Sequence, residues 1–217
     1  MQLSYLSYLL FAVVAYLLGA IPFGLLLGHI TRGIDIRHYG SGNTGATNAL
    51  RTLGWQASAI VFVLDIAKAV VPVLLARWLI SDPAAEVICA LAAIAGHNWP
   101  VYIGWKGGKG VSSSMGVMLL FSPLTTTVGI VLAAGLIVWS RYVSLGSVAG
   151  AVMVALLTLA YAIYGSGLPG AYVAFSLVAA LLVVVRHRSN IARILAGNER
   201  KLGESIKLRG ETAHERP

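Results

Sequence analysis

Three polar segments rich in glycine and asparagine interrupt a strongly apolar sequence, and their residue types suit the binding of phosphate. They are residues 40–51 (GSGNTGATNALR), 96–110 (GHNWPVYIGWKGGKG) and 187–201 (HRSNIARILAGNERK). Glycines let consecutive backbone N–H groups converge on an anion, while basic side chains add charge and hydrogen bonds. Such residues are costly beside lipid unless they face protein, water or a ligand. We therefore expect the functional groups in these three segments.

The first segment combines neutral hydrogen-bonding groups with one fixed charge. Its run of residues 40–45 formally matches the dinucleotide fingerprint, but that fingerprint acts between a strand and a helix of a parallel sheet. Here an apolar segment precedes it, so we reject a dinucleotide cofactor. The clustering predicts an anion site, with a polar connector made of ordinary turn residues as the alternative. The candidate residues are Ser41, Asn43, Asn48 and Arg51.

The second segment ends in the sequence KGGKG, which matches a nucleotide phosphate loop only in part. Ile103 stands where the Walker pattern needs glycine, and neither Ser nor Thr follows the second lysine, so ATP hydrolysis is disfavoured. Paired glycines and lysines at the start of a helix still favour a phosphomonoester site. Anchoring of the lysines at the membrane interface is the alternative. The candidate phosphate-binding residues are Lys106, Gly107, Gly108 and Lys109.

Further candidates lie near or within the apolar segments. His187 and Asn190 are three residues apart in the third segment, where a helix cap and an interfacial histidine are the alternatives. Asp65 and Lys68 are spaced as an intramembrane ion pair, which is expected to be structural, with support of the site from below as the alternative. For His97, a structural hydrogen bond and a catalytic part are both open.

The composition predicts an integral membrane protein. Of the 217 residues 58% are hydrophobic and only 11% are charged. The net charge of +8 is explained by basic cytoplasmic loops, so no nucleic-acid partner is needed. Cys89 is the single cysteine and cannot form an internal disulfide. The sequence has no cluster of metal-ligating residues and only three aspartates, so we expect neither a metal nor another cofactor.

The apolar segments predict an all-α bundle of about seven transmembrane helices. Placing the amino terminus outside and the carboxyl terminus in the cytoplasm puts every Lys and Arg except Lys68 and Arg77 on the inner side. Merging the segments that meet at Ser122–Pro123 would put the basic tail outside. In the seven-span arrangement all three polar segments face the cytoplasm. The predicted spans are 5–27, 56–80, 84–103, 111–121, 123–140, 143–164 and 170–185.

We treat residues 1–201 as one transmembrane domain and residues 202–217 as a basic, flexible cytoplasmic tail. The span 111–121 is the shortest: its helix would rise about 17 Å at 1.5 Å per residue, against ~30 Å for the hydrocarbon core. We expect a monomer, because the spans suffice to enclose their own polar site.

The three polar segments together resemble the signature motifs of the bacterial membrane glycerol-3-phosphate acyltransferases that use acyl phosphate, the PlsY family. The resemblance rests on residues 41–51, on residues 107–110, and on His187 with Asn190 and Glu199. It implies transfer of a fatty acyl group from acyl phosphate to the 1-hydroxyl of glycerol 3-phosphate in phospholipid biosynthesis. The implied location is the bacterial plasma membrane, with the active site on the cytoplasmic side and membrane lipids around it.

The resemblance also implies roles for individual residues. Ser41, Arg51, His187 and Asn190 would be needed for catalysis, with a further serine matched to Ser144 first and Ser147 second. Gly107, Gly108 and Lys109 would hold substrate phosphate, and Glu199 would be structural. Acyl phosphate carries a good leaving group, so direct transfer needs no strong nucleophile. The proton acceptor, either His187 or a substrate phosphate oxygen, is left open.

Two other classes of protein share part of this pattern. A transporter or flippase for a phosphorylated metabolite would also use basic, glycine-rich sites, but nearer the middle of the bilayer. A noncatalytic lipid-binding subunit is the third possibility. Transient docking of a soluble enzyme that makes acyl phosphate on the basic inner face is a further question that the sequence leaves open.

Overall fold

The computed structural model describes residues 5–165 and 167–204, and within them all regular structure is helical. This agrees with the predicted all-α class. The α-helices are α1 (Tyr5–Gly19), α2 (Phe23–Arg32), α3 (Ala46–Leu53), α4 (Trp55–Leu79), α5 (Pro83–Asn98), α6 (Val111–Phe121), α7 (Pro123–Ser140), α8 (Val143–Ile163), α9 (Gly170–Arg186) and α10 (Arg188–Leu195). Two short 3-10 helices are η1 (Ile36–His38) and η2 (Val101–Ile103).

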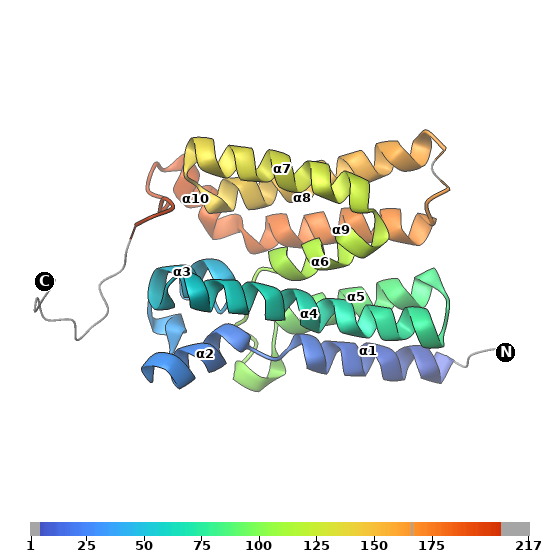
Figure 1. The fold of residues 1–217 in the computed structure, drawn as a ribbon, viewed down its shortest axis with the longest axis horizontal. Helices are drawn as coiled ribbons and strands as arrows, with labels where there is room; N and C mark the ends of the chain where they lie inside the picture. The colour runs from blue at the N-terminus through green and yellow to red at the C-terminus, as the bar shows by residue number, and fades with distance from the viewer. Residues whose placement is uncertain (1–4, 166, 205–217) are drawn as a thin grey trace, which may run out of the picture.

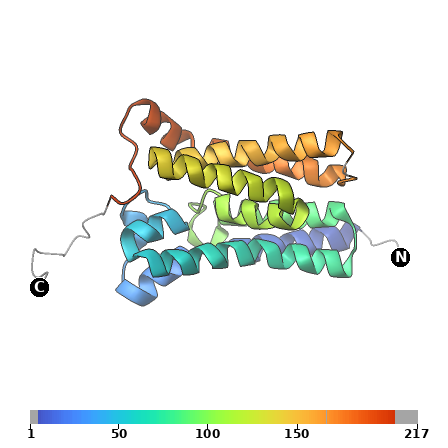
Figure 2. The same cartoon turned by 45° about the horizontal axis from the view of Figure 1, so that its top comes forward.

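The long helices lie side by side in two groups (Figures 1 and 2). One group contains α1, α4 and α5, and the other contains α7, α8 and α9, while α6 contacts both. The short helices α3 and α10 lie at one end of the bundle, and α1 begins at the opposite end. Parts of the chain that are distant in sequence therefore meet at a single end.

The lengths of the helices are those of a multi-pass membrane protein. Among the described residues, the segments long and apolar enough to cross a membrane are Tyr5–Arg32, α4, α7 and α8, and the pair α9 and α10 would be a fifth if its 57° bend belongs to one span. α5 and α6, with 16 and 11 residues, fall short of the roughly 20 residues of a full crossing.

Prolines mark several of the helix boundaries. The predicted segments 111–121 and 123–140 coincide with α6 and α7, which Ser122 separates ahead of Pro123. The predicted span 5–27 lies within the candidate membrane span Tyr5–Arg32, but the chain breaks before Pro22, so this span consists of the two helices α1 and α2. The predicted segment 84–103 is also too long as a helix. α5 ends at Asn98, since the residue before Pro100 disfavours helical geometry.

The contact between α1 and α5 is close because glycines form it. A Cβ atom on Gly19 would overlap the backbone of Ala93, and one on Gly96 would overlap the carbonyl of Tyr16. Lipid-embedded helices gain little from burying apolar side chains, so close backbone approach supplies much of their attraction. Because α5 carries His97 just after Gly96, this packing also fixes the position of that histidine along the bundle axis.

The predicted tail is joined to the bundle at its first residue. The backbone N–H of Leu202 donates to the carbonyl of Arg141 at 2.7 Å, and Nη2 of Arg141 donates to the carbonyl of Leu202 at 2.9 Å. The rest of the predicted tail, from residue 205 onward, lies outside the described residues.

Substituting Gly19→Ala should destabilise the protein, because the added methyl group meets main-chain atoms of α5 that cannot rotate away. Overpacking of this kind costs about 1–3 kcal/mol. The check is the thermal unfolding midpoint in detergent. The matched control is Gly135→Ala in α7, where the methyl group enters open space. Equal midpoints for both variants would contradict the packing argument.

Candidate active site

A cavity of about 340 Å³ begins among the polar segments and continues between the helices. It brings together most of the residues singled out in the sequence, from all three segments. Those that line it are Ser41, Asn43, Asn48, Arg51, Asp65, His97, Lys109, Ser144, His187, Asn190 and Glu199. The predicted convergence of distant segments on one site is therefore observed.

Asn48 organises the first polar segment from within. Its Oδ1 accepts from the backbone N–H of Ser41 at 2.8 Å, and its Nδ2 donates to the carbonyls of Ile36 and Asn43 at 2.9 and 2.8 Å. The side chain is almost fully buried. Both amide protons are used, so the predicted phosphate-binding role of Asn48 has no free donor. Asn48 instead shapes the loop that presents Ser41, whose hydroxyl lines the cavity.

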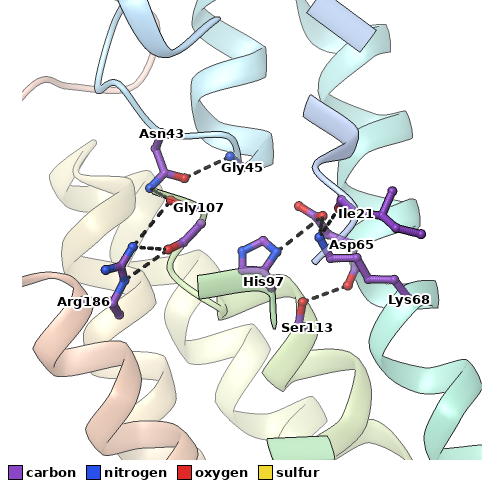
Figure 3. A network of polar contacts seen from close by, with 10 residues as sticks. Ile21, Asn43, Gly45, Asp65, Lys68, His97, Gly107, Ser113 and Arg186 are labelled. Carbon is purple, nitrogen blue, oxygen red and sulfur yellow. Dashed lines mark hydrogen bonds and ion pairs between the residues drawn. The ribbon is translucent and has the colours of Figure 1, made fainter. Parts of the chain in front are cut away.

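The glycine loop of residues 107–110 is held from two sides. On one side Gly107 accepts from Nδ2 of Asn43 at 3.2 Å, and Gly108 accepts from Nη2 of Arg186 at 2.8 Å (Figure 3). On the other side the backbone N–H of Gly108 donates to the carbonyl of His97 at 2.8 Å. The expectation that the Gly108 amide neutralises phosphate is therefore corrected, because a protein carbonyl already takes it.

The glycines of this loop are required by packing against the end of α5. A Cβ atom on Gly108 would overlap the imidazole ring of His97, and one on Gly107 would overlap the His97 carbonyl and the ring of Pro100. Both glycines are buried. Their role is thus to let the loop approach α5, which places the next residue, Lys109, at the cavity.

Lys109 begins a polar chain that crosses the cavity. Its Nζ donates to Oδ1 of Asn190, whose Nδ2 donates to Oε1 of Glu199 at 2.6 Å. The same Oε1 accepts from the hydroxyl of Ser144 at 2.8 Å, and Oε2 accepts from Nε of Arg193 at 2.7 Å. Glu199 therefore fits the structural role predicted for it, because it orients Asn190 and Ser144 at once.

The structure separates several alternatives that the sequence left open. Lys109 lines the cavity, whereas the side chain of Lys106 is exposed and is not part of its lining. Ser144 and Ser147 both line it, but Ser147 donates to the carbonyl of Val143, and Ser144 joins Glu199. Asn190 lies within α10 and does not cap it.

His187, directly after α9, presents one ring nitrogen to the cavity side of the molecule. Its Nδ1 lies 2.8 Å from the carbonyl of Val183, and a carbonyl only accepts, so Nδ1 carries the proton. Burial, helped by the charge of Lys109, lowers the pKa of His187 to about 4. At neutral pH the ring is uncharged, with Nε2 as a hydrogen-bond acceptor. The alternative of an exposed interfacial histidine is excluded by its burial.

A second polar cluster lies beside the glycine loop. Asp65 and Lys68 form the predicted ion pair, with 2.8 Å between Oδ1 and Nζ, and Lys68 also donates to the carbonyl of Ile21 at the break after α1. Nδ1 of His97 lies 3.5 Å from the same carboxylate oxygen, and Ser113 of α6 donates to the backbone carbonyl of Asp65 (Figure 3). This cluster thereby joins α4, α5 and α6 to the break between α1 and α2.

The rest of the cavity is an apolar slot. It runs between α6, α7, α8 and α9, and glycines along it let α7 pack closely against α8. A Cβ on Gly129 would overlap Val154, and Gly146 is in close contact with Ile137. The apolar lining includes Met115, Met118, Ile130, Ala133, Val154, Ala179 and Val183. A polar head beside a long apolar slot suits an amphiphilic ligand with a single tail.

Charges in the cavity do not cancel. Of its acidic residues, Asp65 is paired with Lys68, and Glu199 is paired with Arg193. Arg51 and Lys109 also line the cavity, and neither forms an ion pair with a carboxylate in the part of the chain that the structure describes. Two cations are therefore available to anionic groups of a ligand.

The protonation of Lys109 is sensitive to pH near neutrality. Burial lowers its pKa to about 8, since the attraction of Glu199 is offset by Arg193, Arg51 and Arg186 nearby. The pKa of Glu199 is itself low. Burial opposes its ionisation, but hydrogen bonds from Asn190, Ser144 and Arg193 outweigh that effect. The carboxylate is thus charged, and the ammonium loses its charge as the pH rises through about 8.

Arg186 and Arg193 are functional positions that the sequence analysis missed. Arg186 holds the Gly108 carbonyl and lies over the ring of Trp99, 5.3 Å from its centroid. Arg193 fixes Glu199. Both arginines flank His187 and Asn190 in sequence, and this clustering was the available signal. The sequence counted them only as cytoplasmic charges.

Comparison with known proteins gives consistent matches over nearly the whole chain. The family model described as glycerol-3-phosphate acyltransferase matches residues 9–197. A glycerol-3-phosphate acyltransferase of Thermoanaerobacter pseudethanolicus is 44% identical over 198 residues, which cover 91% of this chain and 97% of the relative. One from a Synechococcus species is 46% identical over 205 residues, covering 93% and 98%.

Two solved structures share the fold. Both are of PlsY, an integral membrane glycerol 3-phosphate acyltransferase. The glycerol 3-phosphate form matches with a TM-score of 0.82 and 37% identity, and the lysophosphatidic acid form with a TM-score of 0.80 and 36% identity. Each match covers 91% of this chain and 96% of the other.

The affinity of the cavity for a phosphate monoester such as glycerol 3-phosphate should fall as the pH rises through about 8, because Lys109 then loses its charge. A phosphate monoester is already mostly a dianion in this range, since its second pKa is about 6. Titration calorimetry between pH 6.5 and 9.5 measures this. The control is Lys109→Arg, whose charge persists, so its affinity should stay nearly constant. A wild-type affinity that is flat up to pH 9.5 would refute the role of the ammonium.

Proposed function

Because the chain belongs to the glycerol-3-phosphate acyltransferase family, and is thus an acyltransferase of phospholipid synthesis, we propose that its donor is acyl phosphate. The acceptor is the 1-hydroxyl of glycerol 3-phosphate, and the products are lysophosphatidic acid and inorganic phosphate. No cofactor takes part. The proposal rests on one observation above all: Arg51 and Lys109, which form no ion pair within the described part of the chain, lie at the head of an apolar slot.

The charge inventory supports two phosphate-bearing substrates. Arg51 comes from α3 and Lys109 from the glycine loop, so the cations approach from different parts of the chain. One phosphate belongs to the donor and the other to glycerol 3-phosphate. A donor with a coenzyme or protein carrier would need a much larger polar surface than these groups offer. The apolar slot between α6 and α9 takes the acyl tail of the donor.

The chemistry asks little of the protein beyond positioning and charge stabilisation. The hydroxyl oxygen attacks the acyl carbonyl, an ester bond forms, and the bond between the carbonyl carbon and the phosphate oxygen breaks. Phosphate leaves with the electron pair. Alignment of hydroxyl and carbonyl supplies much of the acceleration, and donors aimed at the developing oxyanion supply more. Ser41, His187 and Asn190 are the groups we assign to this orientation.

His187 is suited to accept a hydrogen bond from the attacking hydroxyl. It is neutral at physiological pH, and the bond from Nδ1 to Val183 leaves Nε2 as the acceptor. Its low pKa makes it a weak base, which favours a hydrogen bond to the attacking hydroxyl over full proton removal. A phosphate oxygen of the substrate then takes the proton at the end of the reaction. Ser144, oriented by Glu199, contacts substrate and forms no covalent intermediate.

We also propose seven spans, with the amino terminus outside and the site at the cytoplasmic face of the plasma membrane. Since α1 begins at the end of the bundle opposite to α3 and α10, an odd number of passes fits the arrangement. The short α5 and α6 complete seven passes. They meet the glycine loop, so part of their crossing is lined by protein.

The working unit we propose is a monomer in direct contact with membrane lipids, because one chain supplies every group of the site. A soluble enzyme that makes acyl phosphate would meet it transiently at the basic face. The transporter alternative is less well supported, because the polar lining gathers at one end of the bundle and the slot beyond it is apolar.

The purified protein should release phosphate from palmitoyl phosphate only when glycerol 3-phosphate is present. Arg51→Ala should lower kcat/KM by about 10²-fold or more, because a buried charge on substrate phosphate is lost. His187→Ala should act mainly on kcat. Acceptor-independent release, or no turnover by folded wild-type protein, would overturn the acyl phosphate assignment. An acyl group trapped on Ser41 or Ser144 would instead overturn direct transfer between the two substrates.

Ile130 and Val131 provide a test of the apolar slot. Ile130 lines it, whereas Val131 is 65% exposed and faces away. Ile130→Trp should lower kcat/KM for palmitoyl phosphate about tenfold and leave butyryl phosphate nearly unchanged, because only the long tail reaches the added ring. Val131→Trp is the matched control and should leave both values unchanged. A loss that is equal for both donors would argue against this path for the tail.

A further inference from the structure

The glycine loop has little conformational support of its own. Residues 107–110 follow the 3-10 helix η2 and precede α6, and three of the four are glycines, which lose the most backbone freedom on ordering. Lys109, which we take to bind substrate phosphate, stands at the end of this loop. Its position must therefore be imposed by neighbouring groups.

His97 supplies a support on one side of the loop through two different contacts. Its carbonyl accepts the backbone N–H of Gly108 at 2.8 Å, and its imidazole ring lies against the α-carbon of the same glycine. The ring is 4% exposed at the side chain. A Cβ atom on Gly108 would overlap Nε2, so this ring nitrogen lies directly against the loop, while the residue also lines the cavity.

The ring of His97 is in turn placed by the ion pair of α4. Nδ1 lies 3.5 Å from Oδ1 of Asp65, and Asp65 is held by Lys68 at 2.8 Å. Lys68 is anchored to the carbonyl of Ile21, and α6 is fixed to the backbone of Asp65 through Ser113 (Figure 3). The side chains of Asp65, Lys68 and His97 are all at most 4% exposed. Within the described residues Nδ1 of His97 has no hydrogen bond, so its contact with Asp65 and close packing together hold the ring in place.

We propose that Asp65 and His97 are positioning residues. They hold the glycine loop on the side that faces α5, so that the ammonium of Lys109 meets substrate phosphate. The proposal rests on the phosphate-binding role of Lys109 in the proposed function. On its other side the same loop is held by Arg186, which donates to the carbonyl of Gly108, and by Asn43, which donates to the carbonyl of Gly107. With both sides engaged, the loop has one position. Misplacement by about 1 Å can cost 10²-fold in rate, so a buried ion pair of this kind has a direct bearing on turnover.

The test compares variants with Lys109 present and with Lys109→Met. His97→Asn keeps an amide near Asp65 but removes the ring from beneath Gly108. Asp65→Asn keeps the shape of the carboxylate but removes its charge from beside Nδ1 of His97. Gly108→Ala pushes a methyl group into that ring and leaves the ion pair intact. In the presence of Lys109, each change should raise the Kd for glycerol 3-phosphate about tenfold. In the Lys109→Met background each should change it less than about twofold, because effects that act through one group are not additive.

Calorimetric binding of glycerol 3-phosphate and of inorganic phosphate is the readout, since neither needs an acyl donor. Equal fold-changes in both backgrounds, or an unchanged Kd accompanied by a lower unfolding midpoint, would show a merely structural role and overturn the proposal. Gly135→Ala, which adds the same methyl group in open space, should change neither quantity.

The two proposals fail separately. A wild-type protein that binds glycerol 3-phosphate but does not turn over palmitoyl phosphate refutes the donor assignment, and the binding comparison still judges Asp65 and His97. Should His97→Asn fail to fold, Gly108→Ala decides alone, since its added methyl group touches no charged residue and the backbone at Gly108 has no left-handed geometry to strain.

Discussion

Burying charge inside an apolar bundle is costly unless the charge is paired, and the arrangement of this protein follows from how its buried charges are paired. Asp65 and Lys68 satisfy each other and draw the break between α1 and α2 toward α4. Glu199 is satisfied by Arg193 and by two neutral donors. Each ion pair also forms a hydrogen bond with another segment of the chain. The pairing that lowers the cost of burying charge therefore also holds these segments together.

Once these pairs are formed, Arg51 and Lys109 have no carboxylate partner among the described residues at the cavity, and this surplus of positive charge supports the proposed binding of anionic substrates. The remaining polar groups are largely committed to the protein itself. Asn48 and the Gly108 amide, which look like ligand groups, bind protein carbonyls. Much of the polar motif is thus devoted to holding a few groups in place, as direct transfer from a reactive donor requires.

Packing between helices works toward the same end. Glycines at 19 and 96 bring α1 and α5 together, and glycines at 129 and 146 bring α7 into close contact with α8. The contact between α1 and α5 fixes the position of His97 along the bundle axis, and hence the position of the glycine loop that packs against it. The contact between α7 and α8 lies along the slot that we assign to the acyl tail. Small residues therefore determine both the support of the polar head and the course of the apolar slot.

Hydrophobic runs and proline positions sufficed to locate most helices in advance, because both act locally. The segments 111–121 and 123–140 matched α6 and α7 residue for residue. The helix break before Pro22 and the early end of α5 before Pro100 were also encoded locally but were overlooked in continuous apolar runs. The three polar segments, their convergence and the pair of Asp65 with Lys68 were likewise accessible from residue type and spacing.

Only the tertiary structure shows which of those polar groups bind other protein groups and which are available to a ligand. Whether an asparagine or a glycine amide is free depends on which carbonyl lies opposite, and those carbonyls come from distant elements, as with Asn48 and Ile36 or Gly108 and His97. The choice of Lys109 over Lys106 and the part played by Arg186 have the same origin. Residue types along the chain are enough to predict a phosphate site in a membrane bundle. Partners for each hydrogen bond are set by long-range packing, which spacing along the chain does not reveal.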